Sequence, residues 1–65
     1  MDLIEIKSAF IQAVGYDELN KHLRVMIKNN FYDHYEVPNE VYQDFINAKS
    51  KGSFYNKNIR GKYVW

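Results

Sequence analysis

The side chains that could do chemistry in this sequence are two histidines, three serines and a group of cations near the end of the chain. His22 and His34 suggest a metal or acid–base site, but strand parity places them on opposite faces of a sheet, and no third ligand has a suitable spacing. Nucleophilic catalysis needs a serine or cysteine beside a base. Ser8, Ser50 and Ser53 have no histidine near them in the sequence. We therefore expect no enzyme, cofactor, metal or small-molecule substrate.

The last quarter of the chain combines positive charge with aromatic rings. Residues 49–65 carry five basic residues, four aromatic residues and no acid, although the net charge of the chain is only +1. Cations interleaved with aromatic rings suit an anionic, base-bearing partner such as RNA. A solvated cationic end on an otherwise neutral protein is the alternative, and both interpretations stay open at this point.

Length and composition predict one domain that covers residues 1–65. A chain of this length buries only about 60% of its unfolded surface, so its stability is expected to be modest. The absence of cysteine excludes disulfides, and the 11 aromatic residues supply core material instead. No apolar run approaches the roughly 20 residues that span a bilayer. The acids Asp2 and Glu5 stand where a signal peptide carries basic residues. We expect a cytoplasmic protein with no membrane partner.

Three segments have the pattern of antiparallel strands, namely residues 9–16, 22–28 and 31–36. The clearest is the second, in which Leu23, Val25 and Ile27 alternate with polar residues. Asn29-Asn30 predicts a two-residue hairpin turn, because asparagine tolerates left-handed backbone angles.

Helical signals follow the strands. Val37-Pro38 marks a helix start, and Gly52 is expected to stop that helix. A second short helix is predicted from Ser53, as its N-cap, to about Ile59, with Gly61 ending it. Residues 62–65 could form a terminal edge strand. The predicted fold class is therefore α+β: a small three-stranded antiparallel sheet, a covering helix, a short second helix and a possible edge strand.

The predicted hairpin pairs Lys28 with Phe31 and Val25 with His34, which assigns side chains to two faces. The core face under the helix is Leu23, Val25, Ile27, Tyr32 and His34. The opposite face is Arg24, Met26, Lys28, Phe31, Asp33 and Tyr35. A one-residue slip would exchange these faces for one strand.

Several separated blocks of this sequence resemble the KTSC domain. The blocks are Ala13-Val14-Gly15-Tyr16-Asp17, Leu23-x-Val25, Val37-Pro38-x-x-Val41-Tyr42 and Ala48-x-Ser50-x-Gly52-x-Phe54-Tyr55-Asn56-x-x-Ile59-Arg60. This domain is named for the C-terminus of some lysyl-tRNA synthetases and also occurs alone in short bacterial and phage proteins. Its central Tyr-x-Tyr is Tyr32-Asp33-His34 here, a departure that weakens any role tied to the second hydroxyl.

The resemblance implies an RNA-binding role through attachment to synthetases. The family-motif positions, for which structural roles are expected, are Gly15, Tyr16, Asp17, Tyr32, His34, Val37, Pro38, Tyr42, Ser50, Gly52, Tyr55, Asn56 and Ile59. For Asn56 we expect a hydrogen bond that holds the second helix or its cap.

We predict a small module that binds single-stranded or structured RNA weakly, with aromatic rings on the sheet stacking on bases. The predicted contacts are Arg24, Lys28, Phe31, Tyr35, Lys51, Lys57, Arg60 and Lys62. The alternative hypothesis is a protein–protein interaction module, either a homodimer or a phage factor that acts on a host protein.

Overall fold

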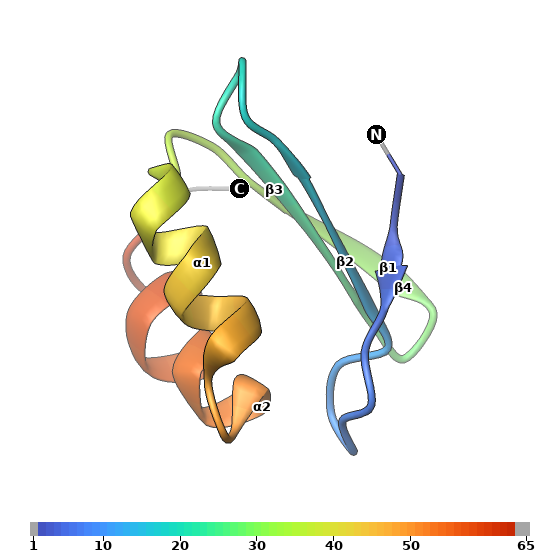
Figure 1. Cartoon of the computed structure of the whole chain (residues 1–65). Helices are drawn as coiled ribbons and strands as arrows, with labels where there is room; N and C mark the ends of the chain where they lie inside the picture. Colours follow the sequence, from blue (N-terminus) through green and yellow to red (C-terminus); the bar gives the residue numbers. More distant parts are fainter. Residues whose placement is uncertain (1, 64–65) are drawn as a thin grey trace.

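The computed structural model describes residues 2–63 and consists of an antiparallel sheet with helices on one of its faces (Figure 1). The strands follow the order β1-β2-β3-β4, with bounds Ile4–Glu5, Ala13–Asp17, His22–Ile27 and Asn30–His34. The helical layer consists of α1 (Asn39–Asn47), α2 (Lys51–Phe54) and η1 (Tyr55–Ile59), a π-helical segment that continues α2. The predicted α+β class with two helical regions is confirmed. Among the described residues, no helix has the length and apolarity needed to cross a membrane.

The sheet has four strands where the sequence predicted three. The extra strand, β1, consists of two exposed residues that pair with β2. Such a short segment has no alternating pattern, so sequence reasoning had no signal for it. The strand predicted over 9–16 begins only at Ala13. Before it, the Ser8 Oγ accepts hydrogen bonds from the backbone N–H groups of Phe10 and Ile11 at 3.2 and 3.3 Å, which holds this segment in a loop.

The hairpin between β3 and β4 turns one residue earlier than predicted. Ile27 pairs with Asn30, so the turn residues are Lys28 and Asn29, with φ angles of 51° and 65°. Left-handed angles at both positions are those of a type I′ turn. His34 faces Leu23 instead of Val25, a shift of two residues along β4. A shift by an even number leaves side chains on their predicted sides, so the core face of the two strands is as expected.

The boundary between the two helices also differs from the prediction. α1 ends at Asn47, and Gly52 lies inside α2 instead of ending the first helix. The N-cap of α2 is Ser50, whose side chain accepts a hydrogen bond from the backbone N–H of Ser53 at 3.3 Å, so Ser53 is not the cap. Residues 62–63 form a turn and a bend where an edge strand was expected. Residues 64–65, the rest of that predicted strand, lie outside the described residues.

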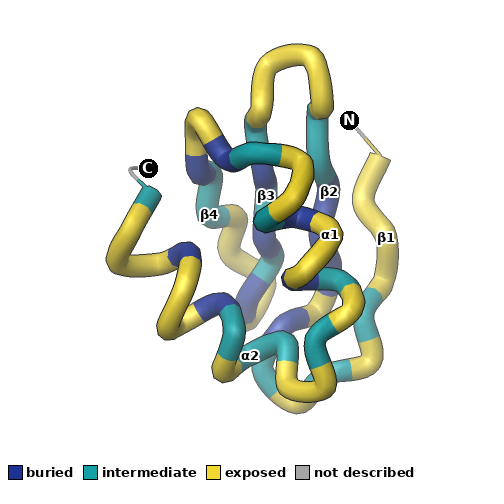
Figure 2. The backbone as a smooth tube through the Cα atoms, turned by 60° about the vertical axis from the view of Figure 1, so that its left-hand side comes forward, coloured by how far each residue is buried: buried dark blue, intermediate teal, exposed yellow. Residues whose placement is uncertain are grey.

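The core lies between the helices and the inner face of the sheet, where the buried positions of β2, β3 and the helices meet (Figure 2). Tyr42 and Phe45 are the buried residues of α1. The ring of Tyr16 stacks on Tyr42 at 4.5 Å, and its hydroxyl donates to the carbonyl of Val37 at 2.6 Å. This pair fixes the entry of α1 onto the sheet. The buried apolar residues are Ile11, Val14, Leu23, Val25, Ile27, Val37, Tyr42, Phe45, Tyr55 and Ile59.

One polar pair is buried in this core. His34 has no exposed surface, and its Nε2 lies 2.7 Å from the hydroxyl of Tyr55, while its Nδ1 lies 3.2 Å from the carbonyl of Tyr63. A carbonyl only accepts, so Nδ1 carries the proton, and the neutral ring accepts at Nε2 from the Tyr55 hydroxyl. Burial lowers the pKa of His34, and its hydrogen bond to the Tyr63 carbonyl opposes this only in part. The histidine is thus a satisfied core residue.

The hairpin turn can be tested with two glycine substitutions. Lys28→Gly should raise the free energy of unfolding by about 0.5 kcal/mol, because relief of the left-handed strain exceeds the added chain entropy. Asn30→Gly should lower it by about 0.5–1 kcal/mol, because position 30 lies in β4. Urea denaturation measures both. Stabilisation by Asn30→Gly alone would support the turn at Asn29-Asn30 instead.

The buried histidine predicts a pH dependence of stability. The pKa of His34 is below the usual 6.5 in the folded state, so the unfolded chain binds the proton more readily. The free energy of unfolding should therefore be highest above pH 6.5 and decline as the pH falls below 6.5, with a slope of up to about 1.4 kcal/mol per pH unit. Urea denaturation between pH 8 and 5 (roughly the range in which histidine titrates) measures the effect.

Two variants identify the residue responsible for that decline. His34→Phe should reduce stability at neutral pH by about 1–3 kcal/mol, since the Tyr55 hydroxyl loses its acceptor, and should flatten the dependence. His22→Gln, on the other side of the sheet, should keep the decline. A wild-type protein equally stable at both ends of the range would refute the assignment.

Candidate nucleic-acid interface

The face of the sheet that points away from the helices carries the side chains most suited to bind a partner. β3 alternates between the two sides, so His22, Arg24 and Met26 point outward while the residues between them are buried. Register places Arg24 opposite Asp33 and Met26 opposite Phe31 on β4. The helical layer leaves this outer face uncovered (Figure 1).

A carboxylate organises the centre of the outer face. Asp33 Oδ1 accepts hydrogen bonds from Arg24 Nε at 2.7 Å and from His22 Nε2 at 2.8 Å. The bond from Arg24 lowers the pKa of the Asp33 carboxyl, burial opposes this, and the His22 bond acts in the same direction as Arg24. Asp33 is therefore ionised at neutral pH, and it holds two neighbouring side chains in fixed positions.

Two aromatic rings flank this carboxylate. The Arg24 guanidinium lies over Phe31, 5.3 Å from the ring centroid, and the His22 ring stacks on Tyr35 with centroids 4.8 Å apart. Phe31 and Tyr35 are each 52% exposed, an unusual degree for rings of this size. About 13 Å separates them along the chain at the rise of a strand. Exposed rings, one of them beside a guanidinium, form a surface on which nucleobases can stack.

A hollow continues the outer face toward β1. Ala13 and Gly15 are the outward residues of β2, and because one carries only a methyl group and the other no side chain, the surface is low between Met26 and the first strand. The hollow has a volume of about 410 Å³, and its lining residues are Leu3, Glu5, Ile6, Ser8, Gln12, Ala13 and Met26. Since Ala13, Met26 and Phe31 follow one another across the sheet, the hollow and the Phe31 ring belong to one surface.

The structure divides the predicted contact residues between separate places. Arg24, Phe31 and Tyr35 share the outer face, as predicted. Lys28 lies at the hairpin turn, where it lines a hollow of about 210 Å³ together with Arg60. The remaining predicted cations, Lys51, Lys57 and Lys62, belong to the helical segment and the turn after it. The eight predicted contacts are thus shared between the outer face, the hollow at the hairpin turn and the helical segment with the turn after it.

Sequence reasoning missed the two residues that hold the outer face together. Asp33 was placed on this face without a function, and His22 was considered only for a metal or acid–base site. The available signal was parity: positions 22, 24, 33 and 35 fall on one side of adjacent strands. As predicted, His22 and His34 lie on opposite sides of the sheet. In the range 2–63, no group of three or more His, Cys, Asp or Glu residues could hold a metal ion.

Most family-motif positions have structural roles in the core and turns. Tyr16, Val37 and Tyr42 form the contact at the start of α1 described above, and Pro38 is its N-cap residue. Tyr32 lines the hollow beside Lys28, and Ile59 is fully buried. The carboxylate of Asp17 accepts from the backbone N–H groups of Leu19 and Asn20 and from the Asn20 side chain, which closes the β2–β3 turn.

Three motif positions gather elsewhere. Ser50, Gly52 and Asn56 line a pocket on the helical side of the molecule. Asn56 was expected to hold the second helix by a hydrogen bond. Its Oδ1 accepts from Arg60 Nη1 at 3.5 Å, a long contact between exposed side chains one helical turn apart.

Comparison with known proteins identifies relatives along almost the whole chain. The family model of the KTSC domain matches residues 7–63. A crystal structure of a KTSC domain protein from Yersinia pestis superposes with a TM-score of 0.93 at 31% identity, covering 97% of this chain and 90% of that one.

Relatives of two lengths occur among curated proteins. A protein from Tsukamurella paurometabola is 34% identical over 59 residues, which are 89% of this chain and 88% of the relative. A lysine–tRNA ligase from Nostoc punctiforme is 31% identical over 62 residues, 94% of this chain. This chain spans only 11% of the length of that ligase.

Proposed function

This chain belongs to the KTSC domain family, and from that premise we propose that it is a binding module that holds single-stranded RNA on the outer face of its sheet. The observation that carries the proposal is a pair of exposed rings held by neighbouring side chains, with the Arg24 guanidinium over Phe31 and the His22 ring stacked on Tyr35. Each ring offers a face to a nucleobase, and a stacked base contributes about 1–3 kcal/mol.

The arrangement favours stacking over charge as the main source of affinity. Asp33 offsets the charge of Arg24, so the outer face alone attracts phosphates weakly. Cations for the backbone lie round the hairpin turn, where Lys28 and Arg60 line one hollow. A strand that stacks on Phe31 can pass Lys28 and reach Arg60. Such a site is short, so we expect binding to be weak.

Names of relatives support the same ligand class. Several proteins similar to this chain are named lysine–tRNA ligase, so a segment of this kind occurs in proteins named for a tRNA. A protein-binding module is the rival function, since the outer face also has an apolar hollow and exposed Leu3. Self-association that depends on protein concentration and proceeds without RNA would favour that rival.

Removal of one ring tests the stacking surface. Phe31→Ala should weaken binding to a fluorescent single-stranded RNA by about 5- to 150-fold, the equivalent of one lost stacked base, and should leave the salt dependence unchanged. Fluorescence anisotropy at several salt concentrations measures both quantities. Leu19→Ala is the matched control, because it removes a 93% exposed apolar side chain in the β2–β3 turn. Equal affinities for wild type and Phe31→Ala would remove Phe31 from the site.

Neutralisation of the central carboxylate tests the electrostatics. Asp33→Asn should release Arg24 to bind a phosphate, so affinity for RNA should rise and the slope of log affinity against log salt should steepen by about 0.7. Asp44→Asn makes the same charge change on an exposed position of α1 and should leave the slope unchanged. Weaker binding by Asp33→Asn would mean that the carboxylate positions the rings and does not compete with RNA.

A further inference from the structure

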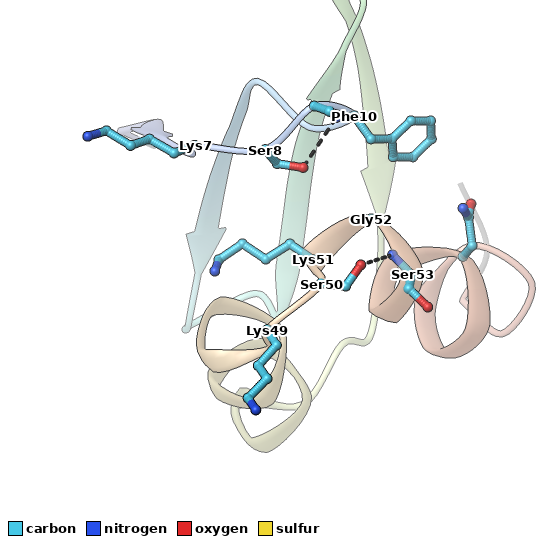
Figure 3. A pocket seen from close by; sticks show the side chains of 10 residues that line it. Lys7, Ser8, Phe10, Lys49, Ser50, Lys51, Gly52 and Ser53 are labelled. Atoms are coloured by element: carbon cyan, nitrogen blue, oxygen red, sulfur yellow. Dashed lines mark hydrogen bonds between the residues drawn. The ribbon is translucent and has the colours of Figure 1, made fainter.

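A further pocket lies between the loop before β2 and the start of α2, and it shares only Ser8 with the hollow of the outer face. Its volume is about 430 Å³ (Figure 3). One wall is formed by residues 7–10 and the other by residues 49–53 with Asn56. Three family-motif positions, Ser50, Gly52 and Asn56, line it, and RNA binding on the outer face gives none of them a function.

The charge of this pocket is entirely positive. Lys7, Lys49 and Lys51 stand at its rim, and no acidic residue is among its lining residues. Lys7 and Lys49 are exposed, and Lys51 Nζ donates to the carbonyl of Ala48 at 3.2 Å. Lysine ammonium groups are compact charges on flexible four-carbon stems, so they can turn toward an anion in the pocket.

Hydroxyl groups from both walls add hydrogen-bond donors. Ser8 Oγ accepts from backbone N–H groups of its own loop, and Ser50 Oγ accepts from the N–H of Ser53. In each bond the serine oxygen is the acceptor, so each hydroxyl keeps its own proton to donate. Figure 3 shows these two serines on facing sides of the hollow. The Asn56 side-chain amide supplies a further donor.

The two walls meet at a glycine. A Cβ built on Gly52 would lie 3.2 Å from Phe10 Cβ, tighter than ordinary van der Waals contact. Glycine thus allows α2 to approach the loop closely, and the contact closes the hollow on that side. Phe10 is in turn held by the Tyr55 ring, at a centroid distance of 6.5 Å.

We propose that this pocket binds a phosphomonoester, either the terminal phosphate of a nucleic acid or that of a free mononucleotide. A monoester carries a charge of about −1.5 to −2 at neutral pH and has three acceptor oxygens, which suits three ammonium groups and two hydroxyls. A backbone phosphodiester carries only one negative charge. The sequence analysis predicted no small-molecule substrate. Strands β2, β3 and β4 and helix α1 separate Lys7 and Ser8 from Lys49 and Ser50 along the chain, so no local pattern joined the two walls.

The experiment is a titration followed by ¹H–¹⁵N NMR, with AMP, adenosine and one RNA sequence that carries either a 5′-phosphate or a 5′-hydroxyl. AMP should shift the amide signals of residues 8–10 and 50–53, and adenosine should not. A preference for 5′-phosphorylated over 5′-hydroxyl RNA identifies a chain end as a ligand, and binding of AMP alone identifies a free nucleotide. The proposal would be overturned if adenosine gave the same shifts as AMP and the 5′-phosphorylated RNA bound no better than the 5′-hydroxyl RNA.

Charge-matched variants locate the site. Lys7→Gln and Lys49→Gln should each weaken binding of the phosphorylated probe about threefold, the loss expected for an exposed ion pair. Lys21→Gln removes the same charge in the β2–β3 turn, at the opposite end of β2, and should leave binding unchanged. An equal loss in Lys21→Gln would refute the pocket as the site. Phe31→Ala should not alter AMP binding, so this test is independent of the outer face.

Discussion

Strand β3 lies between β2 and β4, and the alternation of its side chains decides what every other element can do. Leu23, Val25 and Ile27 enter the core, so the helices must cover that side of the sheet. Polar neighbours are thereby forced outward, where Arg24 meets the side chains of β4. The core face and the outer face both follow from this alternation, and a slip of a single residue in the pairing would destroy both at once.

Alternation is also the part of the fold that the sequence predicted most reliably. The hairpin turn was misplaced by one residue, yet the faces were right because pairing shifted by two. The core face, the α+β class and the placement of the two histidines on opposite sides of the sheet all depend on the alternation of side chains along the strands. This alternation is visible in the local sequence. β1 was missed because Ile4 and Glu5 carry no periodic signal and form a strand only against β2.

Contacts between distant segments account for the other errors. Gly52 was interpreted as a helix stop, since glycine often ends helices, whereas its position reflects the close approach of Phe10 from the loop before β2. The cations after residue 48 were grouped as one basic segment because they are neighbours in the sequence. A helical segment distributes its side chains around its axis, and so these residues face different partners. The position of Gly52 and the directions of these cations both depend on tertiary packing, which a local sequence pattern does not contain.

The buried pair of His34 and Tyr55 shows how a departure from a family pattern can be accommodated. Where the family has a second tyrosine, the imidazole accepts from a hydroxyl of η1 and donates to a backbone carbonyl beyond it. The pair therefore ties β4 to the C-terminal helical segment with all its polar atoms satisfied.

The outermost strands of the sheet have a consequence for behaviour at high concentration. β1 has two residues and β4 has five, and Glu36, with a φ of 60°, bends the backbone away soon after β4 ends. Short strands are poor templates for pairing between chains, the step that starts amyloid-like growth. The two-residue edge formed by β1 thus offers few free backbone groups to a second chain at high concentration.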